Sequence, residues 1–279
     1  MMAYPIGRPS AIRARRWQPL TTKDRDVADE PAVLYERRPP WGWIRLNRPH
    51  VHNAFDSAMR DGLFEALGAA QDDPELAGVV VCGEGPSFGT GGDLRDFSLQ
   101  PLPWRNKLIR RERDVWGRLL RHRCITVALV HGHVAGSGLE LALYCDLRLA
   151  TPDSQWRLPE TGVGMIPGAG GTQLLPRLDR PARAMEMMLL GSAIDGRTAH
   201  RWGLAQSVIE AQPFRAAAQA WLTAHVELHL GREQSASAVP ETAVPGAVSL
   251  ALKALLRRGA DLPLAEGLLL ERRAAGMWP

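Results

Sequence analysis

The chain has 279 residues, a formal net charge of +4 and 45% hydrophobic residues, enough for one or two domains with an apolar core. No apolar run reaches about 18 residues, so no membrane span is expected, and no basic stripe with interleaved aromatics indicates nucleic-acid binding. The mild basic excess suits a phosphate-bearing ligand. Cys82, Cys124 and Cys145 lack metal-type spacing, which favours buried free thiols in a reducing compartment such as the cytoplasm.

Residues 1–30 differ in composition from the rest of the chain. They hold no acidic residue before Asp24 and include Arg8, Arg13, Arg15 and Arg16. The segment is poor in serine and interrupted by prolines, which favours a flexible basic arm over a transit peptide. The arginine-rich composition is more typical of a bacterial protein than of an imported one. We expect a chain that begins near Pro31 to keep its stability and activity.

The next segments predict strands and a capped helix. Residues 33–36 and 43–46 have strand-like patterns, and the Pro-Pro-Trp-Gly sequence at 39–42 predicts a hairpin turn between them. Asp56 is placed to cap a helix whose apolar residues have helical spacing: Met59, Leu63, Leu67 and Ala70. The apolar run at 79–82 is typical of a buried parallel strand.

Further along, helices and strands alternate. Residues 104–121 predict a long arginine-rich helix, and 125–130 and 147–150 predict two more buried strands. This alternation indicates an α/β fold with right-handed crossovers. After Asp179 the chain reads as helical, with helices expected at 181–190, 198–202, 213–230, 248–258 and 264–275. Residues 233–245, rich in Ser, Ala, Pro and Thr, predict a loop.

The most informative stretch places a small-residue turn between a strand and a helix. Gly136-Ser137-Gly138 follows the strand at 125–130 and precedes the apolar helix that carries Glu140. The first N–H groups of a helix lack internal partners, and small residues let a ligand approach them. Such a turn suits an anion or a developing oxyanion. It is equally consistent with a glycine turn that only packs a helix on a strand.

Two glutamates in this stretch stand where folding alone does not require them. Glu140 interrupts an apolar run, so it is either on an exposed helix face or buried for a purpose. Glu160 follows Pro159 and precedes a loop rich in glycine. A pair of nearby carboxylates can supply a general acid and a general base, because each shifts the pKa of the other.

The sequence resembles the enoyl-CoA hydratase/isomerase family, also called crotonases, from about Ala32 to Met277. The matching segments occur in the family's order: Leu46-Asn47-Arg48-Pro49 with Asn53-Ala54, Phe88 to Leu94, His131-Gly132, Gly136 to Ala142, Cys145-Asp146, Pro159-Glu160, Ile166 to Thr172 and Ala199 to Ala205. The resemblance implies an α/β fold built as a spiral of ββα units, although no repeat is visible in the sequence. It also implies a helical C-terminal region that builds a homotrimer or a dimer of trimers. We therefore expect an arm at 1–30, an acyl-CoA-binding core at 31–195 and the helical region at 196–279.

The resemblance also assigns roles to individual residues. The backbone N–H groups of Thr90 and Ser137 would form an oxyanion hole for the thioester, Glu140 would activate water, and Glu160 would protonate the α-carbon. Both glutamates together favour an enoyl-CoA hydratase over an isomerase, which typically keeps only the acid at the Glu160 position. Another crotonase-type enzyme, such as an acyl-CoA hydrolase or decarboxylase, and a non-catalytic acyl-CoA-binding subunit stay open as alternatives.

The coenzyme A part of the substrate is expected along two loops, and no separate cofactor is implied. The expected contacts are Asn53, Ala54, Gly91, Gly92, Asp93 and Leu94, with Arg48 and Arg95 as candidates for the phosphates. Asp93 is better suited to fixing its loop than to chemistry. His131-Gly132-His133 resembles a metal pair, but no third ligand is apparent, so we predict no metal site.

The sequence departs from the family's pattern at several points. Ser137 and Thr90 replace a glycine and an alanine that are usual in the two oxyanion loops. Trp156 and Leu158 replace residues that are often smaller or polar. Together these changes predict an acyl pocket unlike that of a short-chain hydratase. The chain also ends at Pro279, without the further helical segment of many members, so the adenine pocket is expected to be less complete.

Overall fold

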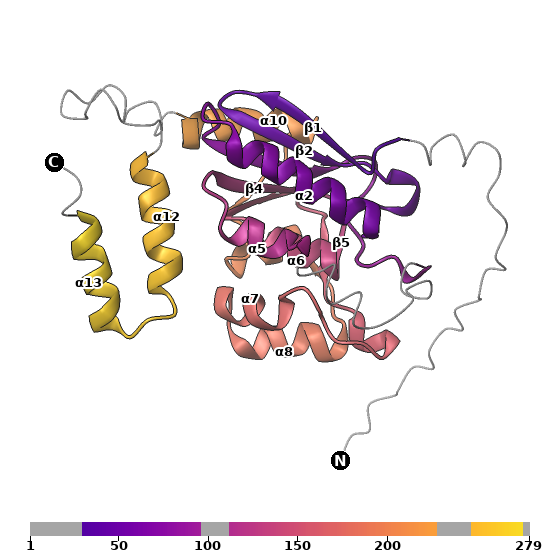
Figure 1. Cartoon of the computed structure of the whole chain (residues 1–279). Helices are drawn as coiled ribbons and strands as arrows, with labels where there is room; N and C mark the ends of the chain where they lie inside the picture. Colours follow the sequence, from indigo (N-terminus) through magenta and orange to yellow (C-terminus); the bar gives the residue numbers. More distant parts are fainter. Residues whose placement is uncertain (1–29, 96–111, 228–246, 276–279) are drawn as a thin grey trace, which may run out of the picture. The chain divides into compact units, whose positions relative to one another are not determined.

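The computed structural model describes residues 30–95, 112–227 and 247–275 (Figure 1). The predicted arm, apart from its last residue, and the predicted loop at 233–245 lie outside the described residues. The first strands are β1 (Val33–Arg38) and β2 (Trp41–Leu46), which pair antiparallel with Arg38 opposite Trp41. The hairpin predicted around the Pro-Pro-Trp-Gly sequence is therefore confirmed.

Helix α2 (Ser57–Asp72) begins where the sequence predicts it. The Asp56 side chain accepts the backbone N–H of Met59 at 2.8 Å, which satisfies one of the donors that a helix start leaves without a partner. The four apolar residues noted at helical spacing are all buried: Met59, Leu63, Leu67 and Ala70. The cap and the apolar face thus fix both the start of α2 and the side that faces the sheet.

The main sheet has six strands in the order β1-β2-β3-β4-β6-β9. Strands β3 (Gly78–Gly83), β4 (Ile125–Val130), β6 (Leu147–Ala150) and β9 (Ser207–Val208) continue from β2 in parallel. Every residue of β3 is buried, as its apolar run predicts.

The two faces of the sheet are covered by different helices. Val79 and Val81 pack on the side of α2, α5 (Val115–Leu120) and α6 (Ser137–Tyr144), whereas Val80 and Cys82 pack on the side of α10 (Phe214–Leu222). This alternation follows from the two-residue period of a strand. All three cysteines are buried and free.

A second, three-stranded sheet follows the order β5-β7-β8. Its strands are β5 (His133–Ala135), β7 (Gln155–Arg157) and β8 (Ile194–Asp195). Helices α7 (Gly171–Leu178), α8 (Pro181–Leu190) and α9 (Gly196–Arg201) belong to the same part of the chain. The sequence predicts α8 at its observed bounds. It predicts α9 with errors of two residues at its start and one at its end, and it does not predict α7 or this sheet.

Two predicted helices differ from the structure. The continuous helix expected at 104–121 is wrong in its described part, because α5 begins only after Asp114, whose carboxylate accepts the Gly117 N–H at 2.8 Å. Residues 104–111 of that prediction lie outside the described residues. The helix expected from Pro213 ends as α10 at Leu222 and continues as a π-helical turn, Thr223–Glu227.

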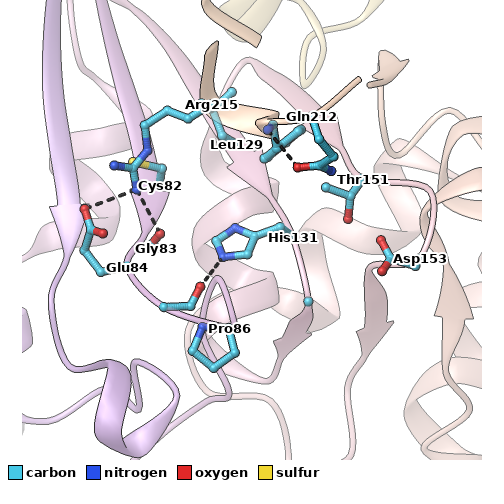
Figure 2. Close-up of a pocket in the computed structure, with 13 residues that line it drawn as sticks. Cys82, Gly83, Glu84, Pro86, Leu129, His131, Thr151, Asp153, Gln212 and Arg215 are labelled. Atoms are coloured by element: carbon cyan, nitrogen blue, oxygen red, sulfur yellow. Dashed lines mark hydrogen bonds and ion pairs between the residues drawn. The ribbon is translucent and has the colours of Figure 1, made fainter. Parts of the chain in front are cut away.

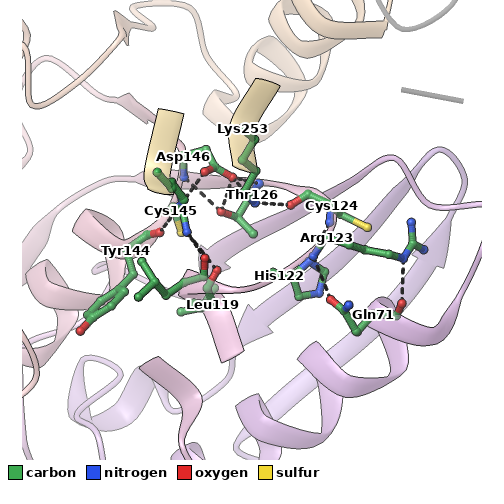
Figure 3. A network of polar contacts seen from close by, with 12 residues as sticks. Gln71, Leu119, His122, Arg123, Cys124, Thr126, Tyr144, Cys145, Asp146 and Lys253 are labelled. Atoms are coloured by element: carbon green, nitrogen blue, oxygen red, sulfur yellow. Dashed lines mark hydrogen bonds and ion pairs between the residues drawn. The ribbon is translucent and has the colours of Figure 1, made fainter. Parts of the chain in front are cut away.

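The last two helices form as predicted, and one of them is bound to the core by charge. They are α12 (Ala247–Gly259) and α13 (Leu264–Ala275). Lys253 and Arg257 of α12 reach Asp146, with N···O distances of 2.7 and 2.6 Å (Figure 3). None of the described helices is long and apolar enough to cross a membrane.

Candidate active site

Two glycine-containing loops meet at the start of α6. The N–H of Gly89 donates to the His133 carbonyl at 3.1 Å, and the N–H of Ala135 donates to the Gly89 carbonyl at 2.8 Å. Gly138 in the first turn of α6 lies 3.3 Å from the position that a Cβ atom on Gly89 would take. Such close backbone contact is possible only because neither glycine has a side chain.

This contact brings the loop that carries Thr90 against Ser137. Gly91 has a φ of +98°, and a Cβ atom on it would lie 3.7 Å from the Ser137 nitrogen. Among the described residues, the backbone N–H groups of Thr90 and Ser137 donate to no protein acceptor. The Thr90 hydroxyl donates to the His52 carbonyl at 3.2 Å. Two N–H groups of this kind suit a developing oxyanion.

Glu140 is completely buried in α6. Its Oε1 accepts the N–H groups of Ala169 and Gly171 at 2.9 and 2.8 Å. Because Gly171 is the first residue of α7, the carboxylate lies at the positive end of that helix. Glu140 therefore joins α6 to the glycine-rich loop, and backbone N–H groups at the start of α7 stabilise its charge.

Glu160 begins the short 3₁₀ helix η3 (Glu160–Val163). Its Oε1 lies against Gly136, where a Cβ atom would stand 3.0 Å away. Its Oε2 is buried and has no hydrogen-bond partner among the described residues. Burial raises the pKa of the Glu160 carboxyl above its ordinary value, and the negative charge of Glu140 adds to the rise. The two predicted catalytic carboxyls thus lie close enough to interact, and Glu160 retains its proton to a higher pH than an ordinary glutamate does.

The loop residues expected to contact coenzyme A are held together by their own side chains. Asn53, which is 2% exposed, donates to the carbonyls of Glu84 and Ser87 at 2.9 and 2.7 Å and accepts the N–H of Arg48 at 2.8 Å. The Arg48 guanidinium contacts the Ala54 carbonyl at 2.6 Å and the carboxylate of Asp56 at 2.9 Å. Arg48 and Asn53 therefore fix the loop that carries Ala54.

The second loop has a comparable arrangement. The Asp93 carboxylate accepts hydrogen bonds from Nε and Nη2 of Arg95, at 2.9 and 2.8 Å. This ion pair lowers the pKa of Asp93 to about 2. The structure thus agrees with the expectation that Asp93 fixes its loop. Leu94 is exposed, and Gly92 bridges to Phe55 in the manner of a parallel strand.

Trp156 and Leu158 lie in the core. Both have no exposed surface, and the Trp156 indole N–H donates to the Ser154 hydroxyl at 2.9 Å. The predicted difference in the acyl pocket therefore does not arise from direct contact with these two side chains. The half-buried rings beside the site come instead from Phe55, Trp116 and Tyr144, which the sequence reasoning missed. The available signal was the position of Tyr144, one helical turn after Glu140.

A cavity of about 460 Å³ lies elsewhere, at the ends of β3 and β4 and the start of α10 (Figure 2). Its lining includes His131, Thr151 and Arg215, and it contains none of the predicted site residues. His131 is engaged with the Gly85 carbonyl at 2.9 Å. Within the described part of the chain, no three His, Cys, Asp or Glu side chains form a group that could hold a metal ion.

Comparison with known proteins identifies the family. The family model described as enoyl-CoA hydratase/isomerase matches residues 42–238. The chain belongs to this family. It is 32% identical over 241 residues to the probable enoyl-CoA hydratase echA8 of Mycobacterium bovis, covering 86% of this chain and 87% of the relative. It is 34% identical over 165 residues to the 2,3-dehydroadipyl-CoA hydratase of Escherichia coli, covering 59% and 64%.

Solved structures give the same result for the fold. The enoyl-CoA hydratase from Bacillus anthracis superposes with a TM-score of 0.75 at 25% identity, covering 88% of this chain and 90% of that one. The enoyl-CoA hydratase from Mycobacterium smegmatis also superposes with a TM-score of 0.75, at 26% identity. The expected membership in the crotonase family and its mixed α/β fold are therefore confirmed.

Proposed function

We propose that this crotonase is an enoyl-CoA hydratase, which adds water across the 2,3 double bond of an enoyl-CoA thioester. The observation that carries the proposal is the pairing of Glu140 with Glu160 beside the N–H groups of Thr90 and Ser137. Family membership implies an acyl-CoA substrate. The names of the relatives support hydration as the reaction.

In the proposed reaction, the two N–H groups bind the thioester oxygen as negative charge builds on it. One such donor contributes about 3 kcal/mol to stabilising a transition state. Glu140 accepts a proton from water while the water oxygen bonds to the β-carbon. Glu160 gives its proton to the α-carbon, and the π electrons of the double bond form the new C–H bond through the enolate. The raised pKa of Glu160 suits this role as the acid.

We further propose that the coenzyme A portion lies along the loops that contain Asn53 and Ala54, and Gly91 to Leu94. Arg48 and Asn53 would act there by holding these backbones in place, because their side chains are engaged with protein groups. Arg95 is paired with Asp93, yet its side chain is 59% exposed and stays within reach of solvent. It is the better placed of the two arginines to meet a phosphate.

The test compares Glu140→Gln, Glu160→Gln and the double variant with crotonyl-CoA and longer enoyl-CoAs. Each change keeps the shape of the side chain and removes its proton transfer, which typically lowers the rate by roughly 10² to 10⁴. The double variant should be little slower than the slower single variant, because residues that act as a unit are not additive. Glu186→Gln, on the exposed surface of α8, is the matched control and should keep full activity.

Exchange of the substrate α-proton with solvent separates the two roles. A protein that lacks only Glu140 should still exchange it through Glu160, whereas one that lacks Glu160 should not. If Glu140→Gln leaves every turnover intact while Glu160→Gln abolishes a double-bond shift, the protein is an isomerase. If the protein instead hydrolyses or decarboxylates the thioester, it is an acyl-CoA hydrolase or a decarboxylase. If it binds acyl-CoA without turnover, it is a non-catalytic binding subunit.

A further inference from the structure

Three aromatic rings form a continuous row beside the two halves of the site. Phe55 stacks on Trp116 with ring centroids 5.5 Å apart and planes at 25°, and Trp116 lies 5.5 Å from Tyr144 at 33°. These spacings lie in the range in which aromatic pairs attract each other beyond their buried area. All three side chains are only partly buried, and they pack on the edge of the main core. We call this row the aromatic wall.

One end of the aromatic wall is attached to the oxyanion loop. The N–H of Phe55 donates to the Gly91 carbonyl at 2.7 Å, and the Phe55 carbonyl accepts the N–H of Asp93 at 2.9 Å. The Phe55 backbone is thus hydrogen-bonded to the residues on either side of Gly92, and this segment follows Thr90 directly. An acyl group whose thioester oxygen is bound at Thr90 would therefore enter at this end of the aromatic wall.

The other end of the aromatic wall stands beside Glu140. Tyr144 follows Glu140 by one turn of α6, so the two side chains share a face of the helix. A Cβ atom on Gly170 would lie 2.5 Å from the Tyr144 hydroxyl oxygen, and the next residue, Gly171, binds the Glu140 carboxylate. Figure 3 shows the Tyr144 ring directed away from the Asp146 cluster, toward which only its carbonyl is turned.

The geometry points to an acyl-binding role for the aromatic wall. We propose that Phe55, Trp116 and Tyr144 line the path of the acyl group beyond the reacting carbons. By stacking, they favour planar conjugated acyl groups, aryl-conjugated ones in particular, over flexible chains of the same size. The proposal rests on the proposed binding of an enoyl-CoA at the oxyanion loops. The row begins at the loop that would hold the thioester and ends beside the base that would deliver water, so it borders the reacting carbons and the acyl group that continues from the β-carbon.

Kinetics with matched substrates test the preference. The pair is cinnamoyl-CoA and trans-2-nonenoyl-CoA, both with nine acyl carbons, and the readout is the ratio of their kcat/KM values. Tyr144→Leu and Phe55→Leu keep an apolar side chain but remove a ring face. Each should lower the cinnamoyl-to-nonenoyl ratio by roughly two- to tenfold. Trp221→Leu removes a half-buried ring on the opposite face of the sheet and should leave the ratio and the activity as in the wild type.

A binding experiment separates this proposal from the proposed function. Benzoyl-CoA and heptanoyl-CoA both have seven acyl carbons and no double bond that can be hydrated, so calorimetry reports the acyl preference without turnover. If the wild type hydrates no enoyl-CoA, the hydratase proposal fails, and the binding ratio still tests the wall. A benzoyl-to-heptanoyl ratio that is the same in the wild type, Tyr144→Leu and Phe55→Leu overturns the proposal.

Tyr144→Phe supplies the second check. It keeps the ring and removes the hydroxyl, so it should retain the preference for cinnamoyl and benzoyl groups. If it loses the preference as fully as Tyr144→Leu does, the hydroxyl and not the ring face selects the acyl group, and the stacking proposal is overturned. If Tyr144→Leu does not fold, Phe55→Leu and Tyr144→Phe decide the question between them.

Discussion

Gly138 is packed directly on the backbone of Gly89: a Cβ atom at position 138 would overlap the Gly89 carbonyl group and stand 3.0 Å from its Cα. This contact joins the first turn of α6 to the loop that carries Thr90. It therefore sets the separation of the two N–H groups proposed as the oxyanion hole.

Replacement of Gly138 by alanine should damage activity far more than an ordinary glycine-to-alanine change. The obstacle is backbone, which cannot rotate away, so the two loops must move apart. We expect a fall in kcat of about 10² to 10³, the cost of a lost oxyanion donor, together with a lower melting temperature. Gly259→Ala is the control, since no atom lies within 4 Å of the added methyl group. Equal activity of the two variants would show that this contact does not position the donors.

The buried carboxyl of Glu160 predicts a pH dependence of stability. Its pKa is raised from the ordinary 4.5 in the folded protein, chiefly by burial. Above pH 4.5 the unfolded chain loses this proton before the folded protein does, so the stabilising contribution of the protonated form is lost as pH rises. The free energy of unfolding of Glu160→Gln relative to the wild type should therefore increase between pH 4 and pH 8, as measured with urea. A difference that is constant over this range would contradict the raised pKa.

Local signals in the sequence predicted the parts of the fold that depend on local interactions. Asp56 and the apolar spacing after it define α2, and the uninterrupted apolar run of β3 defines a buried strand. The same reasoning failed at residues 112–121, because Asp114 caps a new helix there instead of lying inside a continuous one. Strands β8 and β9 have two residues each, which is too short for any periodicity to appear.

The candidate site, like the fold, is predicted by local sequence signals only in part. The residues came from motifs, but the contacts between them come from tertiary structure. Glu140 is held by Gly171, 31 positions away in the chain, and no local pattern specifies that bond. The position of Trp156 shortly before Glu160 predicts a place in the acyl pocket, yet in β7 its side chain lies in the core. Only the fold shows which side of a three-residue strand faces a ligand.

Exposed apolar side chains support an oligomer. Along η3, α7, α8 and the loop between η3 and α7, large apolar residues reach solvent, with exposed fractions of 76% for Ile166, 62% for Leu189 and 74% for Leu190. Apolar groups that gather in this way on a surface commonly mark a protein interface. We predict a homotrimer or a dimer of trimers, and Leu189→Glu with Leu190→Glu should shift light scattering toward smaller species. A stable wild-type monomer at micromolar concentration would contradict this prediction.

The final prediction concerns the attachment of α12. Asp146 binds Lys253 and Arg257, and its Oδ2 also accepts the N–H and hydroxyl of Thr126 at 2.8 and 2.9 Å (Figure 3). The Lys253 side chain is 11% exposed, and burial lowers its pKa against the opposing effect of Asp146. In Asp146→Ala, both cations stay partly buried without their anion, and this loss should destabilise the protein by about 3 kcal/mol.

Urea denaturation measures this loss, and hydrogen exchange locates it. The backbone amides of α12 should exchange faster in Asp146→Ala, because the helix loses the ion pairs that hold it to the corner between α6 and β6. Arg258→Ala removes a neighbouring exposed charge from the same helix and should change stability by only about 0.5 kcal/mol. If Asp146→Ala loses stability while exchange in α12 is unchanged, Asp146 acts through Thr126 and the β4–β6 pairing rather than by attaching α12.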